Sequence, residues 1–171
     1  LVAWVQDDTA PPASVYPKLA DGTLVNWTQE DSGWRALPGI RYPTVIHAPE
    51  FVNRGADFLT QRRSSIEPPL RIGRYGVRVP AYGDDNNERG CLLLPTIAVP
   101  VATLTSWNLR SPSIGAETEL LSLAGGYIPL PANHEAREPT RDPRLSLSER
   151  YANFDDYFAK FQSHISRLIK D

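Results

Sequence analysis

The chain has 171 residues, with 20 acidic and 18 basic side chains and a formal net charge of −2. A chain of this length can bury a core of ordinary size. The near balance of charge argues against a nucleic-acid partner and against a basic membrane-binding patch, because both require clustered positive charge. No apolar run approaches the roughly 18 residues that a membrane span needs, so no membrane span is expected.

Proline and cysteine content narrow the class further. The 16 prolines are about twice the average share, which predicts many fixed turns and few long regular elements. The single cysteine, Cys91, permits no internal disulfide and no thiolate metal cluster. The chain contains no methionine and begins at Leu1. We therefore expect that a preceding part has been cleaved, lost or left out.

The first third of the chain predicts the end of one helix followed by a loop-rich wrap. Leu1 and Trp4 share a face of an amphipathic helix, and Pro11-Pro12 must end it. Turn sequences follow up to about residue 44: Tyr16-Pro17, Asp21-Gly22, Ser32-Gly33, Pro38-Gly39 and Tyr42-Pro43. An extended wrap is expected here, and not an independent sheet.

Short extended segments are expected in the middle of the chain. Val77, Val79 and Ala81 alternate with polar or turn residues, which predicts a short strand. Residues 83–90 are polar and predict a turn. Residues 92–104 are the most apolar stretch, but the two prolines within it argue against a regular central strand or a helix. An extended segment that crosses a buried surface fits this stretch best.

The C-terminus carries the clearest helix signal. Asn153 is a good N-cap, and Asp155 and Asp156 occupy the first turn, where the helix dipole favours negative charge. Apolar residues then follow at helical spacing: Phe154, Tyr157, Phe158, Phe161, Ile165, Leu168 and Ile169. A shorter helical turn is expected over residues 146–151. A face this broad and aromatic must pack on something large.

No catalytic nucleophile is recognisable. The Gly-x-Ser-x-Gly elbow of α/β-hydrolases is absent, and the nearest sequence, Ser111–Gly115, lacks the first glycine. Cys91 precedes three leucines, which favours a small buried apolar residue over a nucleophile. The histidines His47, His134 and His164 are too scattered for a metal site or a His-based motif. We expect neither a metal nor an organic cofactor.

The acidic run Asp84–Glu88 has some features of a calcium loop. An EF-hand beginning at Asp85 would need oxygen ligands where Arg89 and Thr96 stand, so a polar hairpin turn is the better interpretation. Asn26-Trp27-Thr28 matches a glycosylation acceptor, which matters only in a chain exported by a eukaryotic cell.

The segment 103–110 is the best candidate for ligand contact. An apolar stretch ends there in hydroxyls, an indole, an amide and a guanidinium, a mixture typical of a pocket wall. The candidate substrate-binding residues are Thr105, Trp107, Asn108 and Arg110. The alternative is that Trp107 packs in a core while Asn108 caps a turn. The residues themselves leave both interpretations open.

Short motifs in a fixed order connect the chain to a known family. They are Trp4-Val5, Pro11-Pro12, Ser14, Tyr16-Pro17, Leu19–Val25, Ile66–Pro69, Val79-Pro80, Leu94-Pro95, Ala98–Thr103, Thr105, Trp107–Arg110, Gly126–Pro129, Asp142–Arg144 and Leu147–Tyr151. Together they resemble the stretch that follows the catalytic histidine in a family of large, mostly bacterial α/β-hydrolase-domain proteins. Asp8 and Ser106 depart from the family pattern, which commonly has glycine at both positions.

The resemblance implies the C-terminal portion of an α/β fold, with a Ser, acid, His triad lying entirely upstream of Leu1. No catalytic residue is then carried by this chain. The implied activity is carboxylic ester hydrolysis, with a small-molecule ester as substrate and the upstream part of the hydrolase, in the same or a companion chain, as partner. Residues 1–65 would form a core-helix end and wrap, 66–130 pocket-side segments, and 131–171 a linker and terminal helices.

A second hypothesis of a different class remains. The missing nucleophile and the density of prolines also fit a self-contained, non-catalytic, loop-rich binding or structural module. The substrate, the oligomeric state and the cellular compartment are not determined by the sequence.

Overall fold

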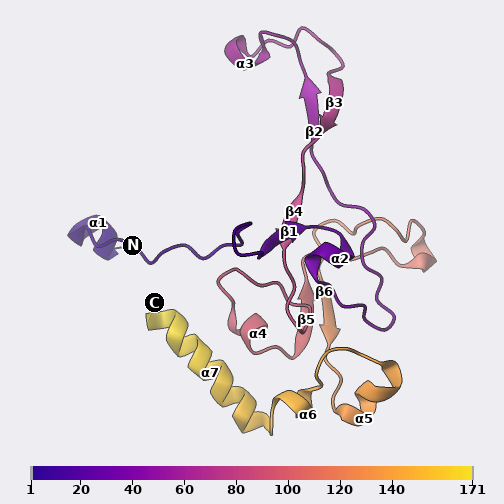
Figure 1. Cartoon of the computed structure of the whole chain (residues 1–171). Coiled ribbons are helices and arrows are strands. Elements are labelled where there is room, and N and C mark those ends of the chain that lie inside the picture. The colour runs from indigo at the N-terminus through magenta and orange to yellow at the C-terminus, as the bar shows by residue number, and fades with distance from the viewer. Residues whose placement is uncertain (1, 171) are drawn as a thin grey trace.

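The structure is a computed structural model that describes residues 2–170 and the side chains of residues 2–169. Its strands form three separate two-stranded antiparallel ribbons (Figure 1). The first joins β1 (Leu24–Asn26) to β4 (Arg78–Pro80), the second joins β2 (Glu50–Asn53) to β3 (Leu70–Arg74), and the third joins β5 (Ala102–Thr105) to β6 (Gly126–Pro129). Short helices lie between them. The predicted mixed α/β content is confirmed, with small sheets and a long C-terminal helix.

The N-terminal third agrees with its prediction. Helix α1 (Val2–Asp7) ends before a long stretch without regular structure, and Leu1 lies outside the described residues. Asp8 adopts a left-handed backbone with φ of 53°, which aspartate tolerates. The turn-rich stretch that follows adds only the three residues of β1 and the single turn of α2 (Gln29–Ser32). All of α1 is exposed, and it lies apart from the body (Figure 1).

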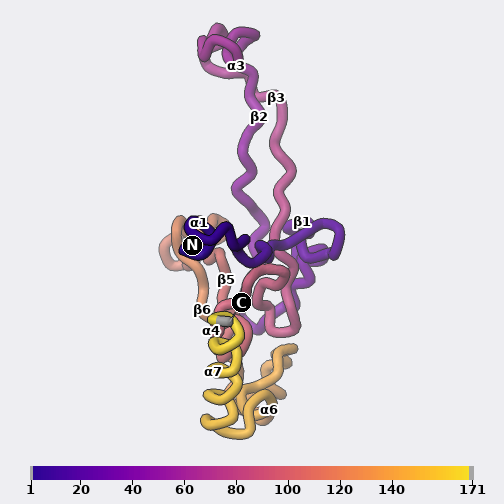
Figure 2. The backbone as a smooth tube through the Cα atoms, turned by 90° about the vertical axis from the view of Figure 1, so that its left-hand side faces the viewer, coloured from indigo at the N-terminus to yellow at the C-terminus, as the bar shows by residue number. Residues whose placement is uncertain are grey.

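The β2–β3 hairpin projects far from the body, with α3 (Phe58–Gln61) at its tip (Figures 1 and 2). One face pairs the rings of Phe51 and Tyr75, with centroids 5.2 Å apart. An ion pair of 3.0 Å joins Arg71 to Glu50. Both strands are almost entirely exposed, and an isolated two-stranded ribbon is only marginally stable in water.

The predicted strand around Val79 and the predicted polar turn are both confirmed. Two side chains of the turn, those of Asn86 and Asn87, are buried, which the polar sequence did not predict. Asn86 exchanges two hydrogen bonds with the backbone of Arg35, at 2.8 and 3.0 Å. The Asn87 side-chain amide donates to Ala102 O and accepts from Leu104 N. The turn therefore ties the first third of the chain to β5.

The apolar stretch 92–104 departs from its prediction in its first part and agrees with it in its second, where the chain is largely buried and extends into β5. Pro95 begins a one-turn helix, α4 (Pro95–Ala98), where an extended segment was predicted. A proline is tolerated at the first helical position because the backbone N–H there has no intrahelical partner. Leu92 and Leu94 are 63% and 62% exposed, so this part crosses no buried surface of the described chain.

The C-terminal helices follow the sequence closely. Helix α5 (His134–Arg137) runs into a 3₁₀ turn, η2 (Glu138–Thr140), and α6 (Leu147–Arg150) follows. Ser146 and Glu149 cap α6 reciprocally, which satisfies two backbone donors. Helix α7 (Phe154–Lys170) begins after Asn153, whose side chain accepts from Asp156 N at 2.9 Å.

Helix α7 packs chiefly against α4 and leaves part of its apolar face exposed. Phe154 is 70% exposed, Phe158 45% and Ile169 79%. The whole chain exposes 12082 Å² of accessible surface. A compact monomer of 19.0 kDa would expose about 8,400 Å². The chain therefore exposes much more surface to solvent than is usual for a folded domain of its size.

Candidate functional site

The segment 105–110 leaves β5 beside the glycine pair that begins β6. Thr105 is buried, and its hydroxyl donates to Trp107 O and accepts from Gly126 N at 2.9 Å. A Cβ on Gly125 would lie 2.2 Å from Thr105 O, and one on Gly126 2.7 Å from Thr105 Oγ1. Only glycine fits so close an approach. Thr105 thus shapes the segment, and both of its side-chain bonds are used internally.

Trp107 lies between the aromatic core and a cavity. Its ring lies 5.2 Å from that of Trp34 and 5.6 Å from that of Tyr42, and its Nε1–H donates to Tyr82 Oη at 3.1 Å. Trp34, Tyr82 and Leu37 form the buried aromatic core, against which Trp107 packs. The indole is only half-buried, and its remaining surface lines a cavity.

That cavity, here called the aromatic pocket, has a volume of about 220 Å³. Its aromatic wall is formed by Trp27, Tyr42, Tyr82 and Trp107. Its polar lining residues are His47, Glu88 and Ser106, and the rest of the lining is apolar. The Ser106 hydroxyl donates to Glu88 Oε1 at 3.0 Å. A mostly apolar pocket with a few converging polar groups is the usual form of a small-molecule site.

Two tyrosines in the pocket wall are held as neutral phenols. Burial raises the pKa of Tyr82 well above its ordinary value, and the hydrogen bond from Trp107 only partly offsets that rise. Burial also raises the pKa of Tyr42, whose hydroxyl donates to Trp27 O at 2.7 Å. The negative charge of Glu88 contributes to both increases. These phenols therefore act as structural hydrogen-bonding groups at neutral pH and not as bases.

Asn108 and Arg110 lie on the other side of Trp107. They line a separate, shallow hollow of about 210 Å³ together with residues 39–41 and 111–112. Asn108 O accepts from Leu121 N at 2.8 Å, and Arg110 Nε donates to Gly115 O at 3.1 Å. The four predicted binding residues therefore do not face one cavity. Trp107 is the residue that the two hollows share.

The remaining candidates have structural roles in the geometry. Ser111 caps the 3₁₀ turn η1 (Pro112–Ile114) by accepting from Ser113 N at 3.3 Å. Burial raises the pKa of the Cys91 thiol, which disfavours the reactive thiolate. His134 is exposed near Glu149, and His164 Nε2 lies 2.8 Å from Leu93 O at the edge of the α7 packing face. No cluster of three metal-ligating side chains occurs within the described residues.

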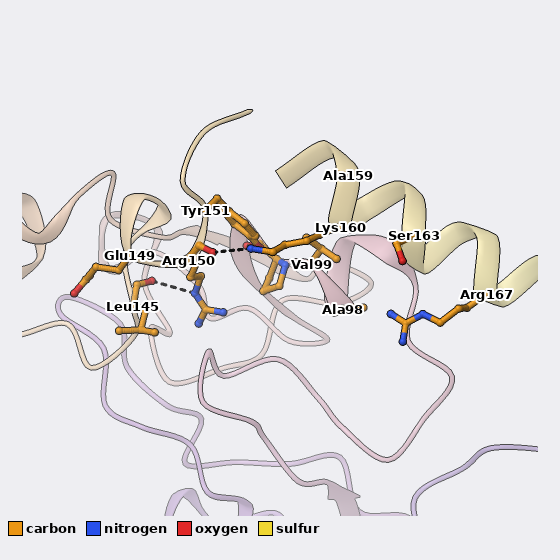
Figure 3. Close-up of a pocket in the computed structure, with 11 residues that line it drawn as sticks. Ala98, Val99, Leu145, Glu149, Arg150, Tyr151, Ala159, Lys160, Ser163 and Arg167 are labelled. Atoms are coloured by element: carbon orange, nitrogen blue, oxygen red, sulfur yellow. Dashed lines mark hydrogen bonds between the residues drawn. The ribbon is translucent and has the colours of Figure 1, made fainter. Parts of the chain in front are cut away.

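A larger, open groove of about 750 Å³ lies where α4, α6 and α7 meet (Figure 3). Its lining is mixed: Ala98, Val99 and Ala159 are apolar, and Lys160 and Arg167 of α7 are charged. Tyr151 donates its hydroxyl proton to Pro100 O at 2.8 Å, and Lys160 Nζ donates to Arg150 O at 3.2 Å. The second of these bonds joins α7 to α6. The groove holds no nucleophile paired with a base, so we interpret it as a packing groove between helices and not as an active site.

These observations define the chain as a mixed α/β domain with an aromatic pocket beside Trp107. A family model described as an alpha/beta hydrolase domain matches residues 1–171. The chain therefore belongs to this alpha/beta hydrolase domain family, and the resemblance drawn from its motifs is confirmed. No curated protein and no solved structure matches it. Across residues 2–170, none of the helices has the length and apolar character needed to cross a membrane.

Sequence reasoning located Trp107 but missed most of the pocket. Trp27, Tyr42, Tyr82 and Glu88 come from segments up to 80 positions away from it. The one sequence feature that could have indicated these pocket residues is the frequency of aromatic residues in the turn-rich segments. That signal does not say which rings meet, because packing between distant segments decides it.

Proposed function

We propose that this chain is the C-terminal region of a serine-dependent carboxylic ester hydrolase whose catalytic triad lies outside these 171 residues. Membership of the alpha/beta hydrolase domain family supports hydrolase chemistry. The acyl-serine route requires a nucleophile, a histidine base and an oxyanion hole in contact with one another. The described residues offer no Ser–His pair of that kind, and Ser106 is bonded to Glu88 instead.

The single observation that carries the proposal is the amount of uncovered apolar surface. Helix α7 presents a row of half-exposed aromatic rings, and the β2–β3 hairpin is exposed on both faces. Exposed apolar patches of this extent mark surfaces that bind another protein surface. The proposed covering surface is the rest of the hydrolase, in the same chain or in a companion chain.

The proposal divides the chain by role. Residues 1–65 supply a core-helix end and the wrap, 66–130 the pocket-side segments, and 131–171 the linker and terminal helices. Thr105 holds the pocket segment in place, and Trp107 forms part of the aromatic pocket wall. Asn108 and Arg110 are proposed to contact substrate from the adjoining hollow.

The test is active-site labelling of the intact protein with a fluorophosphonate, followed by peptide mapping. The expected result is hydrolysis of short p-nitrophenyl esters and a single labelled serine outside the present sequence. Labelling of a serine within residues 1–171 would contradict the proposal that the catalytic triad lies outside this sequence. The absence of both turnover and labelling would favour the non-catalytic module.

Site variants of the intact enzyme test the pocket segment. We expect Asn108→Ala to raise KM or lower kcat severalfold while the melting temperature stays within a few degrees. Trp107→Ala should change both activity and stability, because the indole also packs on the aromatic core. Ser113→Ala, on the exposed 3₁₀ turn, is the matched control. Unchanged kinetics in Asn108→Ala and in Arg110→Ala would reduce the hollow to a packing feature.

A further inference from the structure

We infer that the aromatic pocket binds a positively charged organic group of the alkylammonium class. As a statement about the substrate this rests on the proposed ester hydrolase, but the binding itself requires no catalysis. The inference combines three features of the pocket: its aromatic wall, one carboxylate that has no cationic partner, and its small size.

The aromatic wall is the first feature. Trp27, Tyr42, Tyr82 and Trp107 line one cavity although they come from four separate segments. The faces of aromatic rings carry partial negative charge, and cages of several rings are the usual recognition device for quaternary ammonium groups. Tyr42 and Tyr82 add neutral phenols, since burial raises the pKa of both. The wall therefore contributes electron-rich rings without a competing charge of its own.

The charge of Glu88 is the second feature. Its carboxylate lies in the pocket lining and accepts a hydrogen bond from Ser106. Among residues 2–169, no lysine or arginine side chain reaches ion-pair distance of Glu88. Burial is the main cause of the raised pKa of Tyr42, Tyr82 and Cys91, and the negative charge of Glu88 raises all three further. A half-buried carboxylate beside aromatic rings is stabilised by a cation that enters the pocket.

The composition of the lining argues against other ligand classes. An anionic group would meet Glu88 and would find neither lysine nor arginine in the lining. A large neutral group would exceed a volume of about 220 Å³, which is smaller than ordinary drug-sized sites. The basic side chain in the lining is that of His47, which is exposed. A compact cation with short alkyl groups fits both the charge and the volume.

The experiment compares choline with its neutral isostere, 3,3-dimethylbutan-1-ol, by titration into the intact protein. Binding is followed by tryptophan fluorescence and by isothermal calorimetry. We expect choline to bind at least about tenfold more tightly than the neutral alcohol. Equal binding of the two probes, or no saturable binding of choline, would overturn the inference. This comparison needs no variant and therefore does not depend on whether a mutant folds.

Variants locate the charge that is responsible. Glu88→Gln keeps the size and the hydrogen bond to Ser106 but removes the charge, so choline binding should weaken about tenfold while the neutral alcohol is unaffected. The exposed Glu119→Gln, which removes a charge outside the pocket lining, is the matched control and should bind choline within a factor of about two of the parent. Undiminished choline binding by Glu88→Gln would place the cation elsewhere.

Turnover separates this inference from the proposed function. In the intact enzyme, acetylthiocholine should show a higher kcat/KM than 3,3-dimethylbutyl thioacetate, and Glu88→Gln should remove the preference. Ester hydrolysis without preferential choline binding would reject the cation site alone. Choline binding without serine labelling or ester hydrolysis would reject the hydrolase proposal and leave the binding site standing.

Discussion

The interior of this chain buries many polar side chains beside its aromatic core, whereas its C-terminal helix exposes apolar ones. The largest side chains that are completely buried are polar: Asn86, Thr103, Ser32 and Ser146. Helix α7, at the edge of the molecule, presents aromatic and aliphatic side chains to solvent, and Phe154 is 70% exposed. An ordinary domain shows the reverse distribution.

The difference is explained by which interactions each region finds within the chain: hydrogen bonds for the buried polar groups, and a covering apolar surface for α7. Arg144, 2% exposed, bonds to Asp142 at 2.7 Å, to Thr103 Oγ1 at 2.9 Å, and to the carbonyls of Ile128 and Pro129. Its hydrogen-bonding capacity is met by Asp142 and by neighbours on β5 and β6. The apolar face of α7 needs a broad covering surface, and α4, with a single turn, covers only part of it. The buried polar network around Arg144 is therefore hydrogen-bonded within the chain, whereas several apolar side chains of α7 stay exposed.

The largest effect is expected from breaking the polar interior. Arg144→Met should lower the free energy of unfolding of the intact protein by about 3–5 kcal/mol, because it leaves the Asp142 carboxylate buried without its partner. Urea unfolding of the parent and the variant measures the change. Arg89→Met, on the exposed side of the polar turn, is the control and should stay within about 0.5 kcal/mol. A loss below about 1 kcal/mol in Arg144→Met would show that the network adds little stability.

The second effect tests whether the apolar face of α7 is covered in the intact protein. Phe158 is 45% exposed here and stacks on Phe154, with centroids 5.9 Å apart. If a partner surface covers it, Phe158→Ala should reduce stability by about 3 kcal/mol, the usual cost of truncating a buried phenylalanine. Gln162→Ala, on the exposed side of the same helix, is the control. Equal, small changes in both variants would indicate that α7 stays uncovered, and the contrast between the two regions would then need another cause.

The smallest effect is a dependence of stability on acid pH. The hydrogen bond from the Ser146 hydroxyl, with further bonds from Ser146 N and Arg137, lowers the pKa of Glu149 from 4.5 to about 2. Burial raises the pKa of Asp142, but the bonds and charge of Arg144 outweigh burial and lower it overall. Because both folded-state pKa values are lowered, their stabilisation is complete above the unfolded-state values. It is lost as the pH falls from about 4.5 toward 2.

Urea titrations at pH 7, 5, 4 and 3 measure this dependence. Glu149→Gln should show a shallower loss of stability between pH 5 and 3 than the parent. Glu135→Gln, exposed on α5, should follow the parent curve. A parent whose stability rises on acidification over this interval would contradict the assigned direction of both pKa changes.

Local signals allowed much of the secondary structure to be predicted. The cap at Asn153, the apolar spacing of α7, the helical turn after Ser146 and the strand around Val79 were all readable, because each depends on residues within three or four positions. The family could also be recognised from the sequence, because the order of its motifs along the chain can be compared without knowing which residues they contact. Pro95 shows the limit, because a proline is compatible with a helix start as well as with extended chain.

The sequence by itself therefore determined the terminal helix with its unmatched apolar face, the proline-set turns and the family. Tertiary structure alone decided that Asn86 and Asn87 are buried. It also decided that the Thr105 hydroxyl accepts a hydrogen bond from Gly126 and that Trp107 lines two separate hollows. It also brought Glu88 into a pocket with Trp27, Tyr42 and Tyr82. The physical reason is that helix and turn propensities act along the chain. Burial and close approach depend instead on which distant segments pack together.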